Sequence, residues 1–268
     1  MQVKPPLLAF ACAALVAAWA FAAGPANAAE AVKPLIVGME LAYPPFEMTD
    51  TSGKPAGVSV DLATDLAKSL GRPVVIENTS FDGLIPALKT GKVDLVISSM
   101  TATPERAKSI DFSDPYLSTG LCLLLKKDSP AKSIADLDRA GVKVAVKKGT
   151  TGHLYATNKL RKATVLVLDK ESAAVLEVSQ GKADAFIYDQ MSTYQNWQRN
   201  RATTRALLEP FQKEYWAVGI RQGNDELKRQ VNAFLKDYRQ KGGFEQLGDL
   251  YLKEMKDEFK RLGYSFFL

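Results

Sequence analysis

Gly91-Lys-Val-Asp-Leu-Val-Ile-Ser-Ser99 is the stretch that decides the fold, because it recurs as Gly181-Lys-Ala-Asp-Ala-Phe-Ile-Tyr-Asp189. Each copy follows an apolar helical segment and leads through a turn glycine into a buried strand. A helix, a glycine and a strand often follow one another in α/β proteins, so this match alone leaves chance open. The preceding strands also recur in order, which favours two similar α/β lobes with mostly parallel sheets.

The same alternation extends along the chain on both sides of each copy. Strands are expected at residues 35–38, 74–76, 93–97, 142–146, 165–168 and 183–188, and helices at 58–70, 84–88 and 173–178. Residues 225–251 form an amphipathic helical segment that is expected to cover the first lobe. The chain would then cross between lobes near 118–125 and 210–220. The predicted division is lobe 1 at residues 29–119 plus 216–268, and lobe 2 at residues 120–215.

The N-terminal segment has the features of a secretory signal peptide, assigned to residues 1–28. Lys4 supplies a positive charge, an apolar run covers residues 7–23, and Ala26-Asn-Ala28 is a small-residue cleavage site. An uncleaved membrane anchor is the alternative, but the apolar run is slightly short for a span. The expected location is therefore periplasmic.

Composition excludes several classes of function. The formal charge is +5, from 35 basic and 30 acidic residues spread along the chain, so no nucleic-acid partner is expected. Cys12 lies within the predicted signal peptide, which leaves Cys122 alone, and His153 is the single histidine. These counts argue against an internal disulfide, a metal site or a catalytic triad. We expect a monomer without a cofactor.

The strand ends of the repeat predict where a ligand binds. Ser98 and Ser99 align with Tyr188 and Asp189 at the carboxyl ends of buried strands, outside which open α/β sheets bind ligands. Asp189 is a carboxylate at the end of an apolar strand, so it needs a cation or hydrogen bonds. A ligand ammonium would satisfy that need.

Thr101 to Arg106 form a candidate anion site at the start of a helix. Thr103 suits the N-cap and Pro104 the first helical position, while Arg106 offers a planar fork for a carboxylate. Ordinary capping with a surface arginine is an equally good interpretation. The turn at residues 149–152 could present further amides from the second lobe, although a plain turn is the simpler explanation.

At this point six motifs stand in the order found in one family. They are Tyr43-Pro-Pro-Phe-Glu47, Phe81-Asp-Gly-Leu-Ile-Pro-Ala-Leu88, Gly91-Lys-Val-Asp94, Thr103-Pro-Glu-Arg-Ala107, Asp111-Phe-Ser-Asp-Pro-Tyr116 and Lys148-Gly-Thr-Thr151. The chain resembles the periplasmic polar amino-acid-binding proteins of ABC importers, solute-binding protein family 3. The resemblance implies a two-lobed clamshell with a two-strand hinge.

The resemblance also implies roles for individual residues. The α-carboxylate site would comprise Arg106, Ser99 and Thr101, together with the backbone at Thr151. The α-ammonium site would comprise Asp189 with the Ser99 carbonyl. Tyr43 and Phe81 would form the walls, and the ligand side chain would meet Glu40, Ser98, Lys147 and Tyr188. The family more often has aspartate at the position of Glu40, and the longer arm of glutamate would either reach further into the site or fold back onto Lys147.

The expected function is capture of a small polar amino acid for the membrane permease of an ABC importer. Glu40 and Lys147 together favour a glutamine-like amide, and a basic ligand is the runner-up if Lys147 points to solvent. Two other classes stay open. One is a periplasmic cyclohexadienyl dehydratase, for which Glu40 would be the obvious acid, and the other is a stand-alone sensor module.

Overall fold

The structure is a computed structural model that describes Met1, Gln2 and residues 32–264. The chain divides into two compact units, Met1–Val32 and Lys33–Leu268, and every element named below lies in the second. Apart from its first two residues, the predicted signal peptide lies outside the described residues. Among the residues described, no helix has the length and apolar character that crossing a membrane requires.

The first sheet contains the N-terminal strand and has the order β5-β1-β6-β13-β7. Its strands are β1 (Leu35–Met39), β5 (Val74–Asn78), β6 (Leu95–Val96), β7 (Asp111–Phe112) and β13 (Gly219–Ile220). β1 pairs in parallel with β5 and β6, whereas β13 runs antiparallel to β6 and β7. The helices α1 (Val58–Ser69) and α2 (Leu84–Thr90) bury apolar side chains against it. A small sheet of β2 (Ala42–Tyr43), β3 (Glu47–Thr49) and β4 (Pro55–Ala56) lies beside it in the chain.

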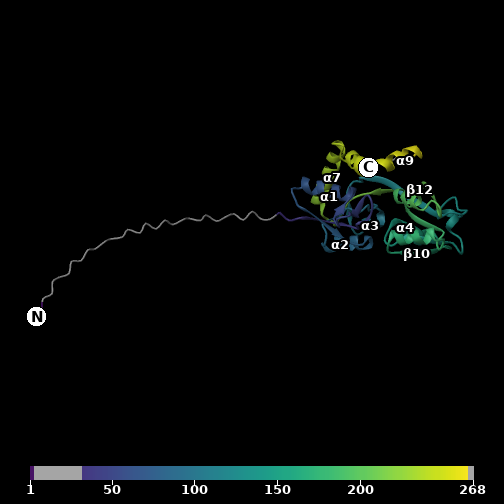
Figure 1. Cartoon of the computed structure of the whole chain (residues 1–268), viewed down its shortest axis with the longest axis horizontal. Helices are drawn as coiled ribbons and strands as arrows, with labels where there is room; N and C mark the ends of the chain where they lie inside the picture. The colour runs from purple at the N-terminus through teal and green to yellow at the C-terminus, as the bar shows by residue number, and fades with distance from the viewer. Residues whose placement is uncertain (3–31, 265–268) are drawn as a thin grey trace. The chain divides into compact units, whose positions relative to one another are not determined.

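The second sheet has the order β10-β9-β11-β8-β12. Its strands are β8 (Leu117–Lys126), β9 (Lys143–Lys147), β10 (Thr164–Leu168), β11 (Ala185–Asp189) and β12 (Thr204–Trp216). The helices α4 (Thr151–Lys159), α5 (Glu171–Ser179) and α6 (Gln190–Arg199) follow β9, β10 and β11 (Figure 1). β9 pairs in parallel with β10 and β11, as expected for β-α-β units.

The sequence repeat has a structural counterpart in the two sheets. Asp94 Oδ2 accepts the backbone N–H of Ile36 at 3.0 Å, and Asp184 Oδ2 accepts that of Lys143 at 2.8 Å. Each aspartate therefore ties the start of its strand to the neighbouring parallel strand. This equivalence explains why the aspartate belongs to both copies.

Two long strands join the sheets. β8 leads from β7 of the first sheet into the second, and β12 returns the chain to β13. The two strands pair antiparallel, with Leu117 opposite Trp216 at one end and Lys126 opposite Thr204 at the other. The fold class is thus confirmed as a two-lobed α/β clamshell with a two-strand hinge. The predicted lobe limits fall within these strands and stay a prediction.

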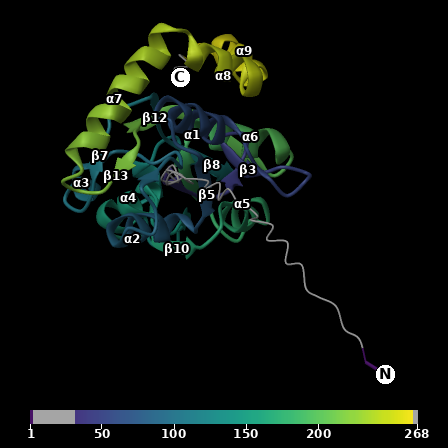
Figure 2. The same cartoon turned by 90° about the vertical axis from the view of Figure 1, so that its left-hand side faces the viewer.

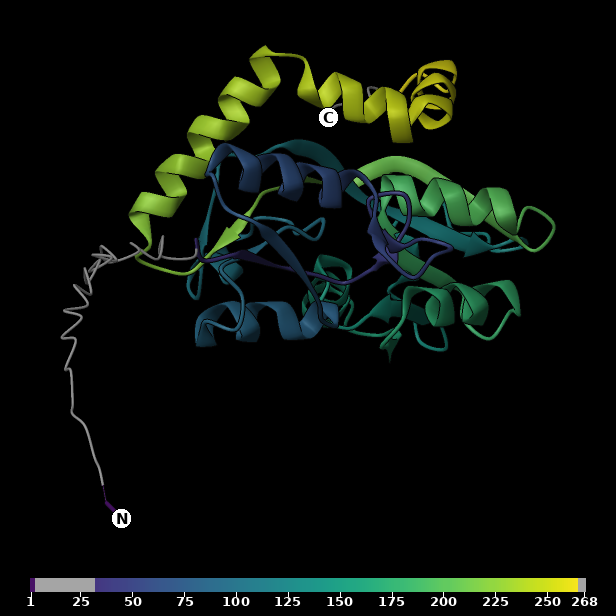
Figure 3. The ribbon, with the colours of Figure 1, turned by 60° about the vertical axis from the view of Figure 1, so that its left-hand side comes forward.

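The C-terminal helices extend further than expected. They are α7 (Asp225–Gln240), α8 (Gly243–Tyr251) and α9 (Lys253–Arg261), with Gly242 in the left-handed region at φ 73° between the first two. α8 contacts α1, where the Tyr251 hydroxyl donates to Asp61 at 2.7 Å. α9 lies beyond the expected segment 225–251 and reaches α6, while its Met255 and Phe259 belong to the same core cluster as the apolar face of α1 (Figures 2 and 3). Phe259 and Tyr194 of α6 meet edge to face, with ring centroids 5.3 Å apart. The assignment of residues 216–268 to the first lobe stays a prediction.

Candidate ligand site

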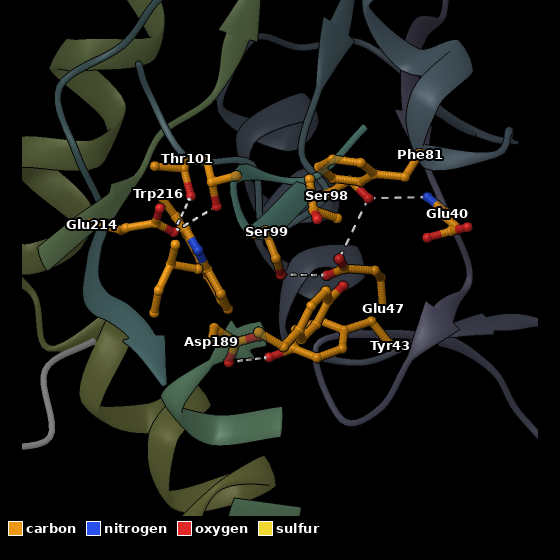
Figure 4. Close-up of a pocket in the computed structure, with 15 residues that line it drawn as sticks. Glu40, Tyr43, Glu47, Phe81, Ser98, Ser99, Thr101, Asp189, Glu214 and Trp216 are labelled. Atoms are coloured by element: carbon orange, nitrogen blue, oxygen red, sulfur yellow. Dashed lines mark hydrogen bonds between the residues drawn. The ribbon is translucent and has the colours of Figure 1, made fainter. Parts of the chain in front are cut away.

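A cavity of about 40 Å³ lies where loops of both sheets meet the hinge strands. Most of the predicted site residues line it, and Figure 4 shows their side chains converging from both sides. The predicted residues in its wall are Glu40, Tyr43, Phe81, Ser98, Ser99, Thr101, Thr151, Tyr188 and Asp189. Arg106 and Lys147 are not part of this wall; both place their cationic groups over the Phe81 ring, at 5.4 and 5.5 Å from its centroid.

Arg106 is held by the short helix α3 (Pro104–Ala107). Thr103 caps this helix by accepting the Arg106 N–H at 3.1 Å, and Pro104 occupies its first turn, as the sequence predicted. The guanidinium donates to the carbonyl oxygens of Thr101 at 2.7 Å and of Gly149 at 3.0 Å. Burial lowers the pKa of Arg106 to about 10, so it remains a cation at neutral pH. The capping by Thr103 is therefore as expected, whereas the alternative of a surface arginine is wrong, because Arg106 is buried.

Glu214 on hinge strand β12 is a site residue that the sequence reasoning missed. Its Oε2 accepts the hydroxyls of Thr101 and Thr151, each at 3.0 Å, and Gln212 donates to its Oε1 at 3.1 Å (Figure 4). Burial raises the pKa of Glu214, and the two threonine hydroxyls and the charge of Arg106 oppose that rise. Its place in the predicted crossing segment 210–220, beside two aromatic residues, was the signal that could have identified it.

Asp189 is the N-cap of α6 as well as part of the cavity wall. Its Oδ1 accepts the N–H groups of Met191 and Ser192 at 3.0 Å and the Tyr43 hydroxyl at 2.8 Å. Burial raises the pKa of Asp189 to about 7, although these hydrogen bonds favour the ionised form. Since all three donors meet Oδ1, the hydrogen bonds seen among the described residues leave Oδ2 for another donor.

Glu40 and Lys147 form an ion pair across the cleft. Lys147 ends β9 and is 2 % exposed, so the alternative in which it points to solvent is wrong. The longer arm of glutamate does fold onto Lys147, as considered for this position. Two of the four residues predicted to contact the ligand side chain therefore satisfy each other.

Glu47 is a second carboxylate that was not assigned a role, although it belongs to the Tyr43–Glu47 motif. It is 2 % exposed and accepts the hydroxyls of Ser59 at 2.6 Å and of Ser99 at 3.0 Å, with Ser98 further away at 3.4 Å. Burial raises the pKa of Glu47 to about 8. It is therefore mostly protonated at neutral pH, which reduces the negative charge of the cleft.

Aromatic rings form the apolar part of the wall. Tyr43 stacks on Phe46 with centroids 5.3 Å apart and meets Tyr188 and Trp216 edge to face at 6.1 and 6.0 Å. Phe46 is 1 % exposed and packs in the core, whereas Trp216 lines the cavity and was missed by the sequence reasoning. Trp216 ends the hinge strand, and its place beside the cavity follows from tertiary pairing with Thr101.

The arrangement suits a zwitterion with a polar side chain. The guanidinium of Arg106 and the nearby threonine hydroxyls could bind an anion. The carboxylate of Asp189 could bind a cation, and the ion pair of Glu40 and Lys147 offers both charges to a polar side chain. The groups come from both lobes, so a ligand that contacts all of them favours the closed form. Within residues 32–264 no cluster of three His, Cys, Asp or Glu has an arrangement that could hold a metal ion.

Comparisons with known proteins agree with this geometry. The model of "Bacterial extracellular solute-binding proteins, family 3" matches residues 35–254. The L-arginine-binding protein of Pseudomonas aeruginosa is 31% identical over 82% of this chain and 88% of that protein. The L-cystine-binding protein of Escherichia coli is 29% identical over 80% and 81% of the two chains. The crystal structure of an ancestral amino-acid-binding protein, a precursor of cyclohexadienyl dehydratase, superposes with a TM-score of 0.74 at 40% identity, covering 81% of this chain and 95% of that one.

Proposed function

Because the chain belongs to family 3 of the bacterial extracellular solute-binding proteins, an amino-acid-binding family of ABC transporters, we propose that it binds its amino acid between Arg106 and Asp189. The Arg106 guanidinium would hold the α-carboxylate together with Ser99, Thr101 and Thr151. Oδ2 of Asp189 would accept the α-ammonium. The observation that carries the proposal is that the buried Asp189 lines the cavity from one lobe, while the buried Arg106 of the other lobe stands directly behind its wall, donating to the carbonyl oxygen of Thr101.

Titration calorimetry on protein that has been unfolded, stripped of bound solute and refolded tests the proposal. Arg106→Ala and Asp189→Ala should each weaken binding more than thirtyfold, because an enclosed ligand charge without its partner costs roughly 2–5 kcal/mol. Arg106→Lys should recover only part of the loss, since an ammonium cannot replace the planar fork. Lys108→Ala, on the exposed side of the same loop, is the matched control. Affinities within threefold of wild type in either alanine variant would contradict the assignment.

A neutral, glutamine-like ligand is the first choice for the side chain. Glu40 faces Lys147, Arg106 lies near Glu214, and Glu47 is mostly protonated, so the cleft has little unmatched charge. A side-chain amide could insert between Glu40 and Lys147 by donating to one and accepting from the other. A basic amino acid is the rival, and it would have to separate Glu40 from Lys147.

Binding without catalysis is the second part of the proposal. The acid considered for a dehydratase, Glu40, is held in an ion pair with the buried Lys147 instead of facing the cavity unpartnered. Prephenate and arogenate should therefore persist unchanged when incubated with the pure protein. Measurable turnover of either compound would favour the enzyme instead.

The remaining parts of the proposal concern the export, location and partners of the protein. The chain would be exported through residues 1–28, act as a periplasmic monomer and deliver its ligand to the permease of an ABC importer, without a nucleic-acid partner. Intact-mass measurement of secreted protein should give an N-terminus at Ala29. A retained N-terminus or an added lipid would contradict the predicted processing.

A further inference from the structure

Glu214 occupies the position expected for the carboxylate of a ligand. The sequence predicted that Thr101 of one lobe and Thr151 of the other would meet an α-carboxylate. Instead, both hydroxyls lie 3.0 Å from the same oxygen of Glu214. The side chain comes from the hinge strand β12 and is 4 % exposed, so water cannot readily take over these contacts.

The charged neighbours of Glu214 are those that a ligand would need. Arg106 of α3 stabilises the negative charge of Glu214, whereas Asp189 of β11 opposes it. The thiol of Cys122 on β8 is another titratable group near Glu214. Gln212, which lies on β12 like Glu214, donates a hydrogen bond to Oε1 of Glu214. A bound α-carboxylate would therefore be a second anion that shares the guanidinium of Arg106 and the hydroxyls of Thr101 and Thr151.

Resting on the proposed function, we infer that Glu214 is an internal carboxylate that competes with the ligand's α-carboxylate for Arg106, Thr101 and Thr151. The competition has two possible outcomes on binding. Glu214 either withdraws from the hydroxyls or stays and takes up a proton, because two carboxylates in one buried site do not both remain ionised without cost. Both outcomes lower the affinity for any α-amino acid, so Glu214 sets the affinity of this site and not its choice of ligand side chain.

The competing charge can be removed without changing the size of the side chain. In Glu214→Gln the amide can still bond the threonine hydroxyls and Gln212, and like-charge repulsion is lost. Affinity for the amino acid that binds wild type should increase about tenfold, which corresponds to about 1.4 kcal/mol of relieved repulsion. Glu209→Gln removes an exposed carboxylate from the same strand and should leave the affinity unchanged. Unchanged or weaker binding by folded Glu214→Gln, and by the shorter amide in Glu214→Asn, would overturn the inference.

Proton exchange separates competition from a merely structural role. Calorimetric titrations at pH 7 in two buffers of different ionisation enthalpy give the number of protons taken up on binding. Where Glu214 stays in the site and takes up a proton, wild type should take up more protons than Glu214→Gln, which lacks that carboxylate. Where Glu214 withdraws as an anion, the proton numbers should be equal and only the affinities should differ. Equal proton numbers together with equal affinities would contradict competition. Failure of wild type to bind any amino acid would instead contradict the proposed function.

Discussion

Glu47 is buried so completely that its carboxyl group titrates near neutral pH in the folded protein. Burial raises its pKa from 4.5 to about 8. Between these values the folded state keeps the proton while the unfolded state loses it, so the free energy of unfolding must fall as pH rises. Glu47→Gln cannot ionise and should lose this pH dependence.

Chemical denaturation of the ligand-free protein at pH 5 and pH 8 measures the effect. Between these pH values the free energy of unfolding should fall by about 3 kcal/mol more in wild type than in Glu47→Gln. Glu245→Gln, on the exposed surface of α8, controls for the general charge balance of the protein. Parallel pH profiles for wild type and Glu47→Gln would show that Glu47 does not titrate in this range.

Lys147 tests which side chain the site accepts. In Lys147→Leu, Glu40 loses its buried cation and becomes available to a ligand cation, while the donor for an amide oxygen disappears. We expect binding of glutamine to weaken and binding of arginine to improve, each by about tenfold or more, because an unpaired buried charge is costly. Competition calorimetry with both amino acids gives the preference. A variant with unchanged preferences would remove the basis for assigning Lys147 to the side-chain end.

At the scale of elements, α4 is positioned by close backbone contact. A Cβ at Gly152 would lie 2.7 Å from the Ile187 carbonyl oxygen of β11, so the helix must shift to accept any side chain. Gly152→Ala should therefore move Thr151 away from the cavity and weaken ligand binding at least tenfold by misplacing a polar contact. Thr157→Ala, on the exposed side of α4, should bind normally. Calorimetry on folded Gly152→Ala with wild-type affinity would disprove this positioning role.

The elements that the sequence predicted well are those with strong local patterns. Helix 58–70 was expected from its leucine spacing and is observed as α1 (Val58–Ser69), and the glycine–aspartate turns of the repeat were recognisable because each aspartate acts within its own lobe. The strand expected at 93–97 is shorter, as β6 (Leu95–Val96). Beyond these two residues the N–H groups of Asp94 and Ile97 still donate to the β1 carbonyl oxygens of Ile36 and Gly38, at 2.8 and 3.2 Å, so pairing with β1 continues past the assigned strand.

The candidate site was harder to predict because its details depend on contacts between lobes. Nothing local indicates that Glu40 and Lys147 neutralise each other across the cleft. Glu214 was missed for the same reason: the two threonines that contact it lie far away in the sequence, one on each side of the hinge. The family motifs identified the polar residues of the site. Only the three-dimensional structure shows which of these residues already pair with each other.

At the scale of the whole molecule, Cys122 offers a test of both processing and packing. It lies at 0% exposure in β8, and burial raises the pKa of its thiol, so thiolate reagents should react very slowly with the native protein. After denaturation, secreted protein should react with one equivalent of an aromatic disulfide reagent, because Cys12 would have left with the signal peptide. Two equivalents would mean that the N-terminal segment is retained. Fast reaction of native protein would contradict the burial of β8.

The contact between α9 and α6 lies outside the ligand cavity and should change when the clamshell opens or closes. α8 rests on α1 of the first lobe, while Phe259 of α9 rests against Tyr194 of the second. Any rotation about β8 and β12 must slide or break that aromatic contact, far from the chemistry of the ligand. A fluorescent dye attached beside Tyr194 could therefore report closure in an amino-acid biosensor. The dye would respond to the movement of α9 against α6, and the residues that recognise the ligand would stay unmodified.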